Sequence, residues 1–181
     1  MIEDRDDRGL VIVYTGNGKG KTTAALGLAL RAVGYGMKVA MIQFIKGSWY
    51  YGELKSAKRL EPEFELVTAG KGFVGIIDDR LDRQEHINAA RDALIISKEK
   101  ITSNLYDIVI LDEINYAVKL DLISVDDVIE LIRLKPAKTT LVLTGNYIDE
   151  RIIDLADIIT EMREVKHHYR QGIKAKRGID F

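Results

Sequence analysis

Short apolar runs, rich in β-branched residues, recur along the chain at the length of single strands. We expect strands at residues 10–14, 39–44, 64–67, 108–111, 140–143 and 157–160. The runs at 108–111 and 140–143 are almost continuously apolar, which is typical of strands that are covered on both faces.

Helical patterns separate these runs. Residues 22–33 are rich in Ala and Leu and end at two nearby glycines, and residues 81–105 have helical composition. A third helix is expected after Ser124, a predicted N-cap, because apolar residues from Val125 to Ile132 have the spacing of one buried face. Alternating strands and helices imply parallel pairing with right-handed crossovers. We therefore expect an α/β fold with a mostly parallel twisted sheet and helices on both faces, formed by residues 1–181 as a single domain.

The composition excludes some classes of function but does not identify one. The formal net charge of −1 selects neither nucleic acid nor membrane as a partner. No apolar run approaches the ~20 residues of a membrane span, and the polar start of the chain lacks the apolar stretch of a secretory signal, so a cytoplasmic protein is expected. The basic stretch at residues 166–177 contains Tyr169 as its only aromatic residue, which favours a solvated tail over a nucleic-acid surface. The chain has no cysteine, so any electron that the function needs comes from another molecule.

A glycine-rich loop joins the first expected strand to the first expected helix, with the sequence Thr15-Gly16-Asn17-Gly18-Lys19-Gly20-Lys21-Thr22. Strand, glycine loop and helix are the context of a P-loop, where backbone N–H groups and the positive end of the helix bind phosphate. The usual motif begins with Gly where this chain has Thr15. Lys21 is expected to bridge phosphate oxygens, and Thr22 to bind Mg²⁺ (or Mn²⁺). The residues expected to contact ATP here are Gly16, Asn17, Gly18, Lys19, Gly20, Lys21, Thr22 and Thr23.

A second metal-binding element closes the strand expected at residues 108–111. Asp112 and Glu113 follow this strand, and either carboxylate can reach a magnesium ion held by Thr22, directly or through water. The two elements together indicate a P-loop NTPase-like (RecA-like) three-layer sandwich that binds a nucleoside triphosphate with magnesium. Hydrolysis, phosphoryl transfer and nucleotide sensing all start from such a site, so the loop alone does not choose among them.

Several segments together carry a resemblance to one family. They are the loop at 15–23, residues 31–39, the Gln-Phe-Ile-Lys-Gly stretch at 43–47, residues 111–114, residues 154–157 and the tail at 165–180. Over about residues 9–181 the chain resembles the P-loop type of ATP:corrinoid adenosyltransferase, the cob(I)alamin adenosyltransferases of cobalamin synthesis and salvage. The resemblance implies that a cobalt(I) corrinoid, cob(I)yrinic acid a,c-diamide or cob(I)alamin, attacks the 5′ carbon of ATP and releases triphosphate. A P-loop ATPase or kinase and a non-catalytic nucleotide-binding regulator are the alternatives.

The same resemblance implies roles for individual residues. Lys21, Thr22 and Arg31 correspond to positions that act on the triphosphate, and Arg163 to a further nucleotide contact. ATP is expected to lie in the loop in the reverse sense, with its 5′ carbon facing the corrinoid. An external electron donor, such as a flavoprotein, and a homodimer are the expected partners.

The corrinoid side is expected to be apolar. Trp49 and Phe73 correspond to positions that face the corrinoid, where large apolar groups favour loss of the lower axial ligand of cobalt. The family pattern has a second aromatic residue beside Phe73, where this chain has Val74 and Gly75. We therefore do not carry the family's corrinoid-face geometry over to this chain.

Overall fold

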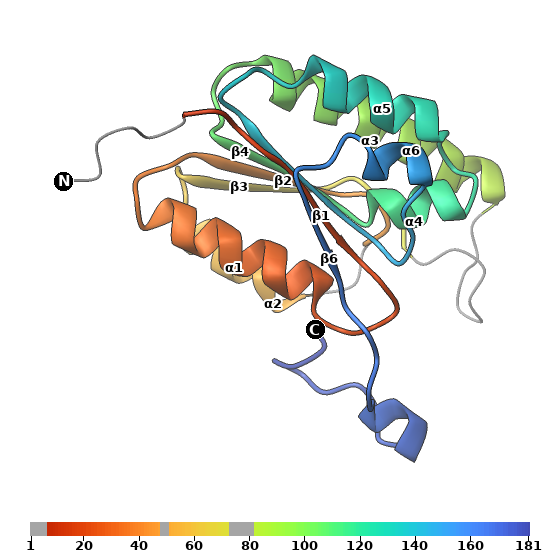
Figure 1. Ribbon diagram of the computed structural model, residues 1–181. Coiled ribbons are helices and arrows are strands. Elements are labelled where there is room, and N and C mark those ends of the chain that lie inside the picture. Colours follow the sequence, from red (N-terminus) through yellow and green to blue (C-terminus); the bar gives the residue numbers. More distant parts are fainter. Residues whose placement is uncertain (1–6, 48–50, 73–81) are drawn as a thin grey trace.

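The computed structural model describes residues 7–47, 51–72 and 82–181, in which strands and helices alternate (Figure 1). The strands are β1 (Val11–Thr15), β2 (Val39–Gln43), β3 (Phe64–Thr68), β4 (Ile108–Asp112), β5 (Thr140–Thr144) and β6 (Ile158–Glu161). The helices are α1 (Lys21–Val33), α2 (Gly52–Arg59), α3 (Arg83–Thr102), α4 (Ile114–Lys119), α5 (Val125–Leu134) and α6 (Glu150–Ile153), with a 3-10 turn η1 (His168–Gln171).

The described strands form one sheet in the order β3-β2-β4-β5-β1-β6, and every neighbouring pair is parallel. Parallel strands share the edge at which their carboxyl ends lie. Gln43 at the end of β2 therefore lies beside Asp112 at the end of β4, and Tyr14 of β1 lies beside Thr144 of β5. The helices that follow β1 and β2 cover one face of the sheet, whereas those that follow β4 and β5 cover the other, so the neighbouring strands β1 and β5 lead to opposite faces (Figure 1). Ligands of open α/β sheets bind in the crevice at such a point.

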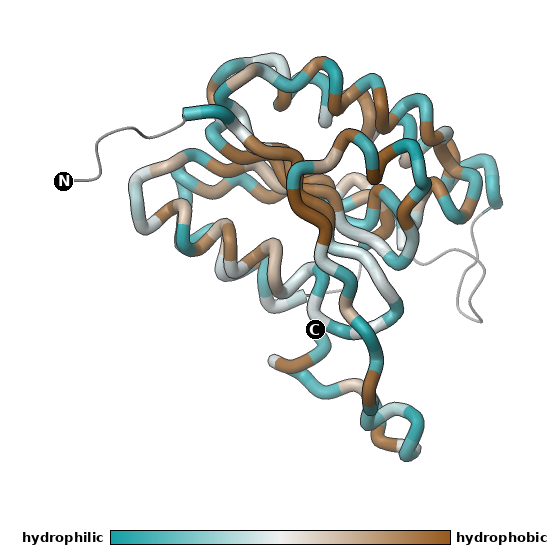
Figure 2. Tube along the Cα trace, in the orientation of Figure 1, coloured by the Kyte–Doolittle hydropathy of each residue, from teal (hydrophilic) through white to brown (hydrophobic). Residues whose placement is uncertain are grey.

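Two apolar layers hold the helices against the sheet. In Figure 1, α1 and α2 cover one face, and α3, α4, α5 and α6 cover the other. Successive strand residues point to opposite faces, so Ile110 packs in the layer beneath α1, whereas Leu111 packs in the layer beneath α3 and α5. The hydrophobic residues concentrate along the sheet between the helices (Figure 2). The side of α1 that meets the sheet carries the small buried residues Ala25, Ala29 and Ala32.

The expected strands are confirmed to within one residue at each end. The helix expected at 22–33 is confirmed as α1, and the helix expected at 81–105 is confirmed as the shorter α3. The third expected helix, α5, begins directly after the predicted N-cap Ser124, whose Oγ accepts a hydrogen bond from the backbone N–H of Asp127. The described sheet is parallel throughout rather than mostly parallel. Helices α2, α4 and α6 were not predicted, because with 8, 6 and 4 residues they show little periodicity. Within the described ranges, no helix combines the length and apolar character that crossing a membrane requires.

Candidate functional site

The glycine-rich loop lies between the end of β1 and the first residue of α1, and its backbone depends on glycine. Gly16 has a φ of 92° and Gly20 a φ of 121°, which are left-handed values that other residues resist. Gly18 approaches the chain after β6 closely: its N–H donates to the carbonyl of Met162 at 2.6 Å. A Cβ on Gly18 would lie 2.7 Å from that carbonyl oxygen, so no larger residue fits without a backbone shift.

Lys21, the first residue of α1, folds back over the loop. Its ammonium donates to the carbonyl oxygens of Gly16 and Gly18, each at 2.8 Å. Burial lowers the pKa of Lys21, and the nearby carboxylates of Glu113 and Asp112 oppose part of that shift. The loop therefore carries a partly buried cation at the N-terminal end of α1, which is the positive end of the helix dipole.

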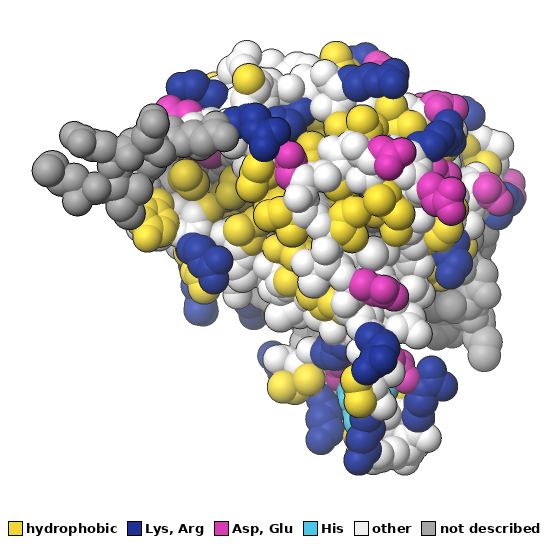
Figure 3. Space-filling view, in the orientation of Figure 1, with side chains coloured by type: hydrophobic (Ala, Val, Ile, Leu, Met, Phe, Trp, Pro, Cys, Tyr) yellow, Lys and Arg dark blue, Asp and Glu magenta, His cyan; other side chains and the backbone are white. Residues whose placement is uncertain are grey.

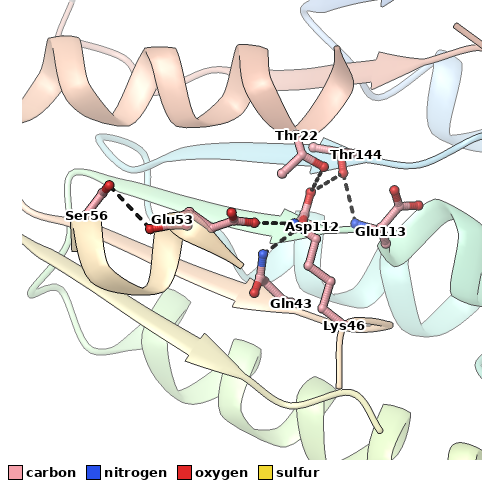
Figure 4. Close-up of polar contacts among 9 residues, drawn as sticks. Thr22, Gln43, Lys46, Glu53, Ser56, Asp112, Glu113 and Thr144 are labelled. Carbon is pink, nitrogen blue, oxygen red and sulfur yellow. Dashed lines mark hydrogen bonds and ion pairs between the residues drawn. The ribbon is translucent and has the colours of Figure 1, made fainter. Parts of the chain in front are cut away.

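Asp112 is the fully buried centre of a hydrogen-bond network (Figure 4). The hydroxyls of Thr22 and Thr144 both donate to its Oδ1 at 2.8 Å. The amide of Gln43 donates to its Oδ2 at 3.3 Å, and the ammonium of Lys46 lies 3.8 Å from the same oxygen. A buried carboxylate is stable only when it is paired and hydrogen-bonded, and here the donors come from α1, β5, β2 and the residues after β2.

Lys46 links this network to α2. Its ammonium forms an ion pair with Glu53 at 2.5 Å and lies 4.7 Å from the centre of the Tyr51 ring. Because the Lys46 side chain is only 12% exposed, these contacts replace water around its charge.

Glu113 directly follows β4 in a left-handed conformation, with a φ of 63°. This conformation costs a non-glycine residue about 1–2 kcal/mol. The backbone N–H of Glu113 donates to Thr144 Oγ1 at 2.9 Å, which holds the turn. Burial raises the pKa of the Glu113 carboxyl to about 7, the charge of Asp112 adds to this, and Lys21 and Lys46 offset part of it. Two neighbouring carboxylates beside a threonine hydroxyl form an oxygen donor set that suits a divalent cation such as Mg²⁺.

A pocket of about 750 Å³ opens beside this network, which is within the range of small-molecule sites. One end is polar and is lined by Lys19, Lys21, Thr22, Lys46 and Glu113. Another part of the lining is mainly apolar and lies between α1 and α2, with Leu26, Leu30, Leu60 and Phe64. Tyr51 and, from the end of the chain, Ile179 and Phe181 also line this pocket. A smaller pocket of about 460 Å³ lies along the loop and the chain after β6, with Lys19 and Lys21 in both pockets. The larger pocket thus joins a site for an anion to a site for a flat or apolar group.

The structure brings several predicted site residues together. Thr22, Asp112 and Glu113 meet at the carboxyl edge of the sheet, and Lys19, Gly20, Lys21, Thr22 and Thr23 line the larger pocket. Asn17 and Gly18 line the smaller pocket, and Gly16 forms the turn before them.

Other predicted site residues lie elsewhere. Arg31 is exposed in the last turn of α1, ten residues or roughly 15 Å along the helix from Lys21, so this chain does not bring it to its own loop. Arg163 is exposed, with its backbone beside Gly18. Trp49 and Phe73 lie outside the described residues.

Three residues of the network were not predicted as site residues, namely Gln43, Lys46 and Thr144. The signal was present for Thr144, a polar residue that closes an apolar strand in the same way as Asp112. Recognising it required the knowledge that β5 neighbours β4.

Comparisons with known proteins bear on the family and the fold of this chain. Residues 7–181 match the family model described as ATP:corrinoid adenosyltransferase BtuR/CobO/CobP. The chain belongs to this family. The corrinoid adenosyltransferase of Escherichia coli (strain K12) is 39% identical over 181 residues, which is all of this chain and 90% of that protein. The corrinoid adenosyltransferase CobA of Salmonella typhimurium is 38% identical over 181 residues, with the same shares covered. The activity is therefore adenosyl transfer from ATP to a corrinoid, as the resemblance implied.

A solved structure supports the fold alone. The flagellar accessory protein FlaH from Methanocaldococcus jannaschii superposes with a TM-score of 0.57 at 15% identity, over 85% of this chain and 71% of that one. The predicted α/β sandwich is thus shared with a protein of very different sequence.

Proposed function

We propose that the protein transfers the 5′-deoxyadenosyl group of ATP to the cobalt(I) of a reduced corrinoid and releases intact triphosphate. Membership of the adenosyltransferase family carries this proposal, and the loop beside a partly apolar pocket of about 750 Å³ agrees with it. In this reaction the electron pair of cobalt(I) forms the carbon–cobalt bond. The bond between the 5′ carbon and its oxygen breaks, and its electrons leave on the triphosphate.

The role of the loop in this proposal is to stabilise the leaving group. Cobalt(I) carries no proton, so the step needs no general base, and it depends on alignment and on neutralising the triphosphate. Lys21 and Lys19 line the pocket, and the positive end of α1 lies there too. ATP lying in the reverse sense would place its 5′ carbon toward the corrinoid.

A magnesium ion fits the site through Thr22, Asp112 and Glu113. Glu113 lines the pocket, whereas both oxygens of Asp112 already accept hydrogen bonds from protein donors. We therefore assign direct contact with the metal to Glu113 and the orientation of the Thr22 hydroxyl to Asp112. The side-chain Oε1 of Gln43 is buried and has no hydrogen-bond partner among the described residues, and we propose that a water molecule of the metal donates to it. When bound, the ion would neutralise charge on the triphosphate.

The apolar end of the pocket is proposed to hold the corrinoid, either cob(I)yrinic acid a,c-diamide or cob(I)alamin. Leu26, Leu30 and Phe64 supply apolar surface there. Arg31 and Arg163 are proposed to contact the triphosphate, Arg31 from the partner subunit of a homodimer, because it lies far from the loop of its own chain. With no cysteine in the chain, an external donor such as a flavoprotein supplies the electron. We also propose that the protein is a cytoplasmic enzyme of a single domain.

Product analysis tests the reaction. Incubation with ATP, Mg²⁺ and chemically reduced cob(I)alamin is expected to give adenosylcobalamin, followed by its visible spectrum, and inorganic triphosphate in equal amounts. Orthophosphate without a carbon–cobalt bond would instead indicate a P-loop ATPase, and binding without consumption of ATP would indicate a regulator.

A lysine substitution assigns the reaction to this loop. Lys21→Ala is expected to lower kcat/KM about 10²- to 10³-fold, which is the usual cost of losing one group that stabilises developing charge. Lys98→Ala is the matched control, because the Lys98 ammonium also makes a 2.8 Å contact, to Glu130, but on the exposed outer surface of α3 and α5. Equal activity of the two variants would remove the loop from the mechanism.

A further inference from the structure

The end of the chain returns to the glycine-rich loop. After β6 the backbone N–H of Met162 donates to Thr15, and Gly18 donates to Met162, so the chain runs beside the loop. It then forms η1 and turns back at Gly172, which has a φ of 76°. The final residues reach the larger pocket, where Gly178 to Phe181 line one wall. In Figure 1 the C-terminus lies near the first turn of α1.

Asp180 makes the contact between this segment and the loop. Its Oδ1 accepts from the ammonium of Lys19 at 2.8 Å. Its Oδ2 accepts from the backbone N–H of Lys176 at 2.8 Å and lies 3.5 Å from Nε2 of His168. The Asp180 side chain is 14% exposed, although the residues on either side of it are largely exposed. These contacts lower the pKa of Asp180 to about 2, with Lys19 as the largest cause, so the carboxylate is charged at neutral pH.

Lys19 occupies a particular place in the loop. It lines both pockets, and its side chain is 41% exposed. A lysine side chain on a surface samples many rotamers, and fixing it when a ligand binds costs conformational entropy. The contact with Asp180 fixes the Lys19 ammonium before a ligand arrives and uses one of its three N–H groups, which leaves two for phosphate oxygens.

We propose that Asp180 is a positioning residue for ATP binding, which holds the ammonium of Lys19 at the triphosphate site and makes residues 178–181 a wall of that site. The proposal rests on the assignment of the loop to ATP. The triphosphate gains a fixed cation, while Oδ2 of the carboxylate keeps its contacts with Lys176 and His168.

The same groups could also be considered a metal site, because ligand atoms of His167, His168 and Asp180 lie within 4.8 Å of one another. Two contacts favour the lysine instead. Lys19 already occupies Oδ1 of Asp180, and its charge repels a divalent cation. His167 Nδ1 accepts from the backbone N–H of Tyr169 at 3.2 Å, which uses the lone pair of a neutral imidazole. Lys and Arg side chains gather on the projecting segment that carries these residues (Figure 3), which adds to the repulsion.

Two substitutions of Asp180 distinguish a carboxylate that positions Lys19 from one that competes with phosphate for Lys19. Asp180→Ala is expected to raise the KM for ATP about tenfold with kcat changed less than about twofold, because only the freedom of Lys19 changes. Asp180→Asn keeps an acceptor for Lys19 and is expected to raise that KM less than about threefold. If the carboxylate instead competed with phosphate, both variants would lower the KM, which would overturn the proposal.

Two controls make the test specific. Asp107→Ala removes a carboxylate that also accepts from a backbone N–H, that of Lys38 at 2.8 Å, but at the opposite edge of the sheet, and is expected to leave the KM unchanged. In a Lys19→Ala background, adding Asp180→Ala is expected to have no further effect, and a full additional loss would show that Asp180 does not act through Lys19. Calorimetric titration of each variant with Mg-ATP measures binding without turnover. Wild-type protein that binds ATP without forming adenosylcobalamin would refute the proposed reaction and leave the positioning test intact.

Discussion

Thr144 provides a test of the network around Asp112, because its hydroxyl serves two partners. Oγ1 donates to Asp112 Oδ1 at 2.8 Å and accepts from the backbone N–H of Glu113 at 2.9 Å, and the residue is fully buried. Thr144→Val keeps nearly the same shape but removes both hydrogen bonds. It leaves the N–H of Glu113 without this acceptor and Oδ1 of Asp112 with Thr22 as its remaining hydroxyl donor.

The cost can be worked from these two bonds. A hydrogen bond to a charged group contributes roughly 1.5–3 kcal/mol and a neutral one about 1 kcal/mol. Thr144→Val is therefore expected to lower the free energy of unfolding by about 3 kcal/mol, a large share of the roughly 5–15 kcal/mol typical of a domain. Thr144→Ser keeps the hydroxyl and loses only a methyl group, at about 1 kcal/mol.

Urea unfolding followed by circular dichroism measures both variants. The midpoint is expected to fall in the order wild type, Thr144→Ser, Thr144→Val, with an unchanged dependence on urea concentration, since the surface exposed on unfolding is the same. A Val variant that is as stable as the Ser variant would refute the reasoning, because it would mean that the hydroxyl contributes no more than its neighbouring methyl group.

Two glycines and one aspartate give further predictions for stability. Gly18→Ala places a Cβ 2.7 Å from the Met162 carbonyl oxygen and is expected to lower the free energy of unfolding by about 1–3 kcal/mol. Gly27→Ala meets no neighbouring atom within 4 Å of its Cβ and is expected to stabilise α1 by up to about 1 kcal/mol. Thermal unfolding of the two variants measures the difference. Asp157 accepts from the Val11 N–H at 2.8 Å and pairs with Arg8 at 3.1 Å, and these contacts lower its pKa, the Val11 N–H most. Because the pKa of Asp157 is lower in the folded state, the ionised carboxylate stabilises the fold at pH values above the unfolded-state pKa of about 3.9, and this stabilisation is lost as the pH falls through the folded-state pKa. Asp157→Ala is therefore expected to lower the free energy of unfolding by about 1 kcal/mol at pH 7 and by less near pH 3. An equal cost at both pH values in urea unfolding would contradict this assignment.

The strands could be predicted from the sequence because the sheet is covered on both faces. Burial on both sides makes β2 and β4 apolar along nearly their whole length, which is a strong local signal. The helices α4 and α6 gave no comparable signal. Helix α4 starts after a left-handed Glu113, a conformation set by the contact of its N–H with Thr144, and that contact is not local in sequence.

The site residues that belong to local sequence motifs could be predicted, whereas those brought together by the strand order could not. Thr22 and Asp112 belong to motifs whose spacing and context carry their chemistry, and they do meet, at 2.8 Å. Gln43 and Thr144 reach Asp112 from β2 and β5 because these strands flank β4, and the order of strands is a property of the whole sheet. The position of Asp180 depends on a turn that brings the last residues back to the glycine-rich loop, and no local sequence pattern predicts this turn.

The strand order also explains why a charge can be buried at the end of β4. Asp112 lies at the centre of the carboxyl edge, so that each side of the carboxylate meets a different neighbour: Thr144 and Thr22 at one oxygen, Gln43 and Lys46 at the other. A carboxylate at the end of the edge strand β6 would have a partner strand on one side only. The same hydrogen bonds that make the buried charge tolerable also fix the Thr22 hydroxyl at the start of α1. Stability and ligand binding therefore depend on shared contacts here, and a substitution that loosens Asp112 is expected to weaken both.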